Sequence, residues 1–111
     1  MPNISALNPP DVAPIFAALG DARRLSIINR LQEAPNQSVT DICQGFDLAR
    51  QGVSRHLRVL EDAKIVQARR LGRETRYSLD IETLTAAKAY LTRAASQWDD
   101  ALGRLETHIT D

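Results

Sequence analysis

The stretch from Ser38 to Leu60 holds the side chains with the clearest chemistry in this chain of 111 residues. Its second half predicts a helix on which Val53, Leu57 and Leu60, at i, i+4 and i+7, form one apolar stripe. The rest of the circumference carries polar side chains: Arg50, Gln51, Ser54, Arg55 and Arg58. Arginine and glutamine read the edges of guanine and adenine, and arginine and serine also bind phosphate. A helix with these two faces is suited to the major groove of DNA.

Four more arginines follow this helix in a predicted hairpin. Residues 65–71 and 74–79 have the pattern of two strands, and Gly72-Arg73 suits the turn between them. The arginines are Arg69, Arg70, Arg73 and Arg76. A basic hairpin directly after a helix-turn-helix is typical of a wing, whose cations follow the phosphate backbone or enter the adjacent minor groove. A solvated hairpin edge is the plainer reading, which the neighbouring basic helix disfavours.

The charge of the chain is unevenly distributed, although 14 basic and 14 acidic residues cancel. Residues 49–79 carry eight basic and three acidic residues, a net charge of +5. Residues 1–48 carry three and five, a net −2, and residues 80–111 carry three and six, a net −3. A basic middle segment favours a nucleic-acid partner. It disfavours the alternative of a winged-helix protein-interaction module without specific DNA binding, because protein interfaces tend to deplete charge at their centres.

Shorter helices are expected to hold the helix of Val53, Leu57 and Leu60 in place; this helix is called the reading helix below. The first covers about residues 10–19, and the second, about 22–33, follows Asp21, a suitable N-cap. The second helix is expected to bury Leu25, Ile28 and Leu31, with Ile27 extending the stripe. Residues 34–37 read as a polar break.

The third helix is expected to begin near Ser38 or Val39 and to lead through a tight turn to the reading helix. Ala49 falls at the N-cap of the reading helix, where its methyl group accepts no hydrogen bond. Cys43 lies on the apolar stripe of the third helix, so a small core residue is the plainer reading and a thiol sensor the alternative. As the single cysteine, it excludes a disulfide or a paired-cysteine metal site within one chain.

The last helix, about residues 81–108, is long for a domain of this size. Leu84, Leu91, Trp98 and Leu105 recur every seven residues, and small or apolar residues interleave with them, Leu102 among these. This spacing is typical of a helix-pairing seam. The stripe is longer than the core of one small domain covers, so pairing with a second copy is expected.

Together these elements predict a single domain over residues 1–111, mainly α with a small β-hairpin. Its fold class is an α+β winged helix-turn-helix with the order α-α-α-α-β-β-α, a DNA-reading core at about residues 22–79 and a long terminal helix. The chain has no apolar run near the ~20 residues that cross a bilayer and no signal-peptide pattern. The expected location is therefore cytoplasmic, at the nucleoid. It also has no phosphate loop, activated nucleophile or carboxylate cluster, so neither an enzyme nor a cofactor is expected.

Three segments resemble the ArsR/SmtB family of bacterial winged helix-turn-helix repressors: residues 18–28, residues 53–61 and Arg76-Tyr77-Ser78-Leu79. The likeness covers roughly residues 12–105. It implies a homodimer formed through the first and last helices, which represses transcription from an inverted-repeat operator. The positions that match the DNA-contacting ones of the family are Arg50, Gln51, Ser54 and Arg55. The predicted interface comprises Val12, Ile15, Phe16, Leu84, Leu91, Trp98, Leu102 and Leu105.

The chain departs from the family where many members bind metals. Cysteines at the start of the third helix are replaced by Ser38 and Thr40, and the last helix offers only His108 as an imidazole ligand. No set of three or four donors for zinc or arsenite is present. No metal is therefore expected and the sequence identifies no effector, which leaves repression without a small ligand as an alternative. Two further questions stay open. His56 either contacts phosphate or packs against its neighbours, and Tyr90 and Trp98 either line a ligand pocket or pack in the dimer.

Overall fold

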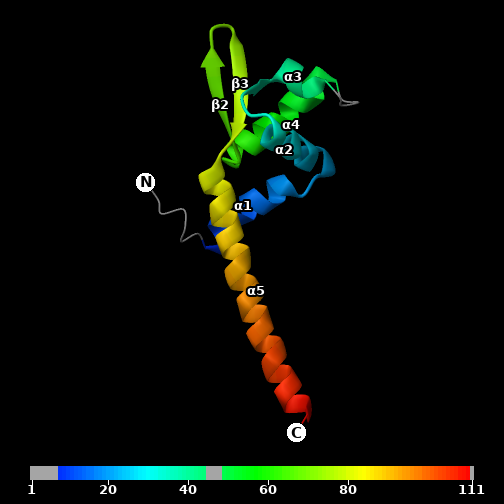
Figure 1. Cartoon of the computed structure of the whole chain (residues 1–111), viewed down its shortest axis with the longest axis vertical. Coiled ribbons are helices and arrows are strands. Elements are labelled where there is room, and N and C mark those ends of the chain that lie inside the picture. Colours follow the sequence, from blue (N-terminus) through cyan, green and yellow to red (C-terminus); the bar gives the residue numbers. More distant parts are fainter. Residues whose placement is uncertain (1–7, 45–48, 111) are drawn as a thin grey trace.

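A long terminal helix projects from a small head in the computed structural model (Figure 1), which describes residues 8–44 and 49–110, with side chains through residue 106. The elements are α1 (Pro9–Leu19), α2 (Ala22–Glu33), β1 (Gln37–Ser38), α3 (Val39–Cys43), α4 (Arg50–Asp62), β2 (Val66–Leu71), β3 (Glu74–Leu79) and α5 (Ile81–Thr110). The molecule measures 67 × 35 × 22 Å, and α5 lies along its length. The predicted fold class and all seven predicted elements are confirmed. The turn expected between α3 and α4 includes residues 45–48, which lie outside the described part of the chain.

The prediction of a polar break at residues 34–37 was wrong at its end. Gln37–Ser38 forms strand β1, which pairs antiparallel with β3 (Gln37 opposite Tyr77, Ser38 opposite Arg76), so the sheet order is β1-β3-β2. Gln37 is buried, and its side-chain amide donates to the carbonyl oxygens of Arg30, at 2.9 Å, and Ala34. The carbonyl of Arg30 also accepts from the backbone N–H of Ala34, so the Gln37 amide adds a second bond there and ties β1 to the end of α2. A strand of two residues is too short for a pattern, and it forms because the edge of β3 is available.

The core of the head lies between the helices and one face of the sheet. On α2, Ile27, Ile28 and Leu31 are buried, whereas Leu25 is 45% exposed, which corrects the prediction that Leu25 would be a core residue. Residues of a helix are about 100° apart, and the stripe is centred between Ile27, Ile28 and Leu31. Leu25 therefore lies roughly 110° from the centre of the stripe and faces outward.

Side-chain caps begin several of the described helices, α2 and α3 among them. Asp21 Oδ1 accepts from the backbone N–H groups of Arg23 and Arg24 at 2.9 and 3.2 Å, as predicted for the start of α2. The bond from the N–H of Arg24 is the largest cause that lowers the pKa of the Asp21 carboxyl. Ser38 and Asp41 cap α3 reciprocally, and both bonds are 3.1 Å. These two caps fix where α2 and α3 begin.

Candidate nucleic-acid interface

Helix α4 presents the predicted polar face to solvent because its opposite face is fully buried. Val53, Leu57 and Leu60 each have no exposed surface and pack in the core of the head, which confirms the predicted stripe. Ala49 is the N-cap and makes no side-chain bond, also as predicted. The helix is held by its packing rather than by its cap.

The five predicted reading residues of α4 are all exposed. Gln51, Arg55 and Arg58 lie at i, i+4 and i+7, directly opposite the buried stripe, and form a ridge. Arg50 and Ser54 lie on one flank of this ridge. Asp62 continues the ridge one turn beyond Arg58, and its carboxylate repels phosphate. The amino-terminal part of α4 is therefore the part suited to a DNA groove.

The other flank of α4 faces the junction of α1 and α2. His56 lies on this flank, half-buried, with its Nδ1 atom 3.4 Å from Nη1 of Arg24. This position agrees better with packing than with free exposure to phosphate. The sequence reasoning missed Arg24, because residues 32 positions apart show no periodic signal that pairs them.

The wing is the hairpin of β2 and β3, with Gly72 at its turn. Gly72 has φ +66°, in the left-handed region that glycine adopts at little cost. The register places Arg69 opposite Arg76 and Arg70 opposite Thr75, so Arg69 and Arg70 point to opposite faces. Arg69, Arg70 and Arg73 are exposed, and Nε of Arg70 donates to the carbonyl oxygen of Gly72 at 3.3 Å. These three cations surround the tip of the wing.

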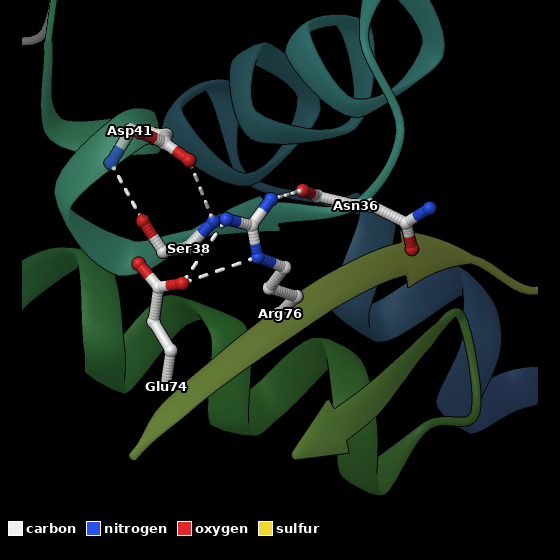
Figure 2. A network of polar contacts seen from close by, with 5 residues as sticks. All are labelled: Asn36, Ser38, Asp41, Glu74 and Arg76. Carbon is white, nitrogen blue, oxygen red and sulfur yellow. Dashed lines mark hydrogen bonds and ion pairs between the residues drawn. The ribbon is translucent and has the colours of Figure 1, made fainter. Parts of the chain in front are cut away.

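Arg76 differs from the other wing arginines because it forms an ion pair and also binds a residue outside the hairpin (Figure 2). Its Nη2 atom forms an ion pair with Glu74 at 3.1 Å, and its Nη1 atom donates to the carbonyl oxygen of Asn36 at 3.0 Å. These bonds link β3 to the segment before β1. A phosphate contact by Arg76, as the sequence predicted, would compete with them.

The predicted interface residues fall into two groups. Val12 and Ile15 are 2% and 5% exposed and pack in the chain's own core, and Phe16 and Leu84 are half-buried against it. Val12 and Ile15 therefore offer little surface to a partner, because α1 uses its apolar face to cover its own head. The exposed group lies on α5 and comprises Leu91, Trp98, Leu102 and Leu105, which are 49% to 68% exposed.

Nothing in the described part of the chain forms a metal cluster. Among those residues there is no group of three or more His, Cys, Asp or Glu side chains that could hold an ion. Ser38 is 4% exposed and caps α3, and Cys43 is half-buried against the core, in keeping with the plainer reading of this cysteine. His108 lies among the terminal residues whose side chains are not described. None of the helices that the structure describes is both long and apolar enough to cross a membrane.

Comparison with known proteins agrees with this geometry. Residues 14–67 match the family model described as a helix-turn-helix domain. The chain is 34% identical over 90 residues to the HTH-type transcriptional regulator Rv2034 of Mycobacterium tuberculosis, and the match covers 81% of each protein. It is 30% identical to an ArsR-like transcriptional regulator from Rhodococcus, with a TM-score of 0.78, covering 87% of this chain and 91% of that one.

The chain belongs to the ArsR family of transcriptional regulators. The resemblance seen in the sequence is thereby confirmed, and the family's winged helix-turn-helix is the fold observed. Another similar structure is a homodimeric winged helix-turn-helix DNA-binding domain of Mycobacterium bovis, described as a possible ArsR-family regulator. It is 25% identical, with a TM-score of 0.61, and the match covers 78% of this chain and 79% of that one. These relatives are regulators with a DNA-binding fold and not enzymes.

Proposed function

We propose that this ArsR-family chain is a homodimeric repressor that binds an inverted-repeat operator sequence-specifically. The observation that carries the proposal is the ridge of Gln51, Arg55 and Arg58, exposed directly opposite the buried stripe of α4. Such a ridge is the part of a recognition helix that reaches base edges in the major groove. The repressor would act at the nucleoid in the cytoplasm.

The side chains divide into two roles in this proposal. Gln51 and Arg55 carry the bidentate groups that read adenine and guanine, with Arg50 and Ser54 steering at the flank. Arg58 and the wing supply attraction to phosphate, which positions the helix without reading sequence. Within the wing this falls to Arg69, Arg70 and Arg73, and Arg76 contributes to the extent that it leaves Glu74.

The dimer is proposed to form along α5. Leu91, Trp98 and Leu105 recur at the heptad spacing and are exposed where α5 extends beyond the head. A second copy offers the same stripe, so each covers the other, as the homodimeric state of the M. bovis relative also suggests. With α1 packed on α5 in each head, the pair would hold two recognition helices about one helical turn of DNA apart, roughly 34 Å.

The test is selection of binding sites from a random DNA pool, followed by affinity measurements on the selected and scrambled sequences at several salt concentrations. The proposal predicts an enriched inverted repeat and a log K that falls by about 0.9 per neutralised phosphate for each log unit of salt. Arg55→Ala should abolish the enrichment at one half-site position. If no sequence is enriched and binding is equal on scrambled DNA, the alternative of a protein-interaction module takes its place.

A further inference from the structure

Arg24 joins three helices through one guanidinium group. It lies in the first turn of α2, and its Nε atom donates to the carbonyl oxygen of Ala18 at 2.6 Å, while Nη2 donates to that of Ala17 at 3.4 Å. Its Nη1 atom lies 3.4 Å from Nδ1 of His56 on α4. The two carbonyls are at the carboxyl end of α1, where the helix dipole also favours a cation.

The partners of Arg24 are themselves held in place. The backbone N–H of Arg24 donates to the capping carboxylate of Asp21. Helix α1 is packed on α5, where the rings of Phe16 and Tyr90 lie 5.9 Å apart at 53°. A continuous set of contacts therefore runs from α5 through α1 and Arg24 to the recognition helix.

The contact with His56 bears on how α4 is rotated. His56 directly follows Arg55, whose side chain belongs to the exposed ridge. Because an arginine only donates, a hydrogen bond between the two side chains requires the tautomer of His56 in which Nδ1 accepts and the ring proton lies on Nε2. The planar fork of arginine reaches all three acceptors at once, which a lysine ammonium on its flexible stem does not reproduce.

We propose that Arg24 is a positioning residue for specific DNA binding: by bridging α1 and His56, it sets the rotation of the recognition helix relative to α1 and, through α1, to the dimer-forming α5. The inference rests on the proposed function, since it assigns a residue that orients the same reading face. Arg24 touches no base in this arrangement. It acts by keeping the ridge of α4 aligned with the groove while the partner copy binds the second half-site.

The experiment compares Arg24→Lys with Arg23→Lys, which changes the exposed neighbouring arginine in the same way. Affinity is measured for the selected and the scrambled DNA, with dimer mass and thermal midpoint as checks on assembly and fold. Arg24→Lys should lower affinity for the selected site roughly three- to tenfold, which lies in the lower part of the range of coupling between contacting residues. Affinity for scrambled DNA and the salt slope should stay unchanged, and Arg23→Lys should match the wild type.

His56→Ala supplies the second arm, because it removes the contact with α4 and leaves the bonds of Arg24 to α1 intact. His56→Ala should lose selectivity as Arg24→Lys does, and the double variant should be no worse than the poorer single variant. If Arg24→Lys lowers the thermal midpoint, its loss of affinity could come from unfolding, and the result for His56→Ala then decides whether the contact with α4 positions the recognition helix. Full selectivity in either single variant, or additive losses in the double variant, overturns the inference. Absence of selectivity in the wild type would instead overturn the proposed function.

Discussion

The head and the distal half of α5 use the same helical spacing of apolar residues with opposite results. In the head, Val53, Leu57 and Leu60 are covered by neighbouring elements of their own chain. The carboxyl-terminal part of α5 projects from the head (Figure 1), and on this helix Leu91, Trp98 and Leu105 are 54%, 68% and 57% exposed. The difference shows that an apolar stripe predicts a buried helix face but does not identify the element that buries it. In the head the cover is intramolecular, and along α5 we assign it to a second copy.

The largest effect is expected from a change in the core of the head. Leu57→Ala removes buried methyl groups and leaves a cavity, so it should lower the free energy of unfolding by about 2–5 kcal/mol. Urea unfolding followed by circular dichroism measures the loss. Val59→Ala on the exposed side of the same helix is the control, and a similar loss there would contradict the division of α4 into a buried and an exposed face.

A charge on the distal part of α5 tests whether a second copy covers the apolar stripe of this helix. Leu91→Asp should weaken the dimer on the order of 100-fold, because it places a carboxylate within an apolar seam. Sedimentation equilibrium measures the mass as a function of concentration. Ser96→Asp adds the same charge at a neighbouring exposed position away from the heptad residues and should leave the dimer intact. An unchanged dimer mass for Leu91→Asp would contradict the α5 seam.

Changes on the reading face sharpen the distinction between base and phosphate contacts. Gln51→Ala or Arg55→Ala should relax preference at one half-site position by roughly 1–3 kcal/mol. Arg73→Ala at the wing tip should weaken binding evenly across sequences and reduce the salt slope by about 1. Affinities on a panel of single-base variants of the selected site separate the two patterns. A uniform loss for Arg55→Ala would make Arg55 a phosphate contact.

The smallest effect is expected at Arg76, where the head and the wing meet. Arg76→Gln removes an ion pair whose partners are partly exposed, so the stability lost should be under about 1 kcal/mol. Its salt slope should change less than that of Arg73→Ala, because Arg76 is held by Glu74 and Asn36. Equal changes in slope for the two variants would show that Arg76 leaves these partners to bind phosphate.

Local pattern was sufficient for much of the fold and for the polar face of α4. The stripe of Val53, Leu57 and Leu60, the cap at Asp21 and the hairpin around Gly72 depend on residues within a few positions of one another. Their geometry follows from helix periodicity and from the hydrogen bonds of short side chains. Once the buried face of α4 is known, its exposed face is known as well.

Tertiary structure alone decided which element covers which face. It placed Ile27 rather than Leu25 at the centre of α2, and it turned Val12 and Ile15 into core residues of the head. It paired Gln37–Ser38 with β3, held Arg76 to Asn36, and brought Arg24 to His56. Each of these contacts joins segments whose distance depends on the packing of the whole head. Periodicity within a segment shows that a face is apolar, but the partner of that face is set by non-local packing.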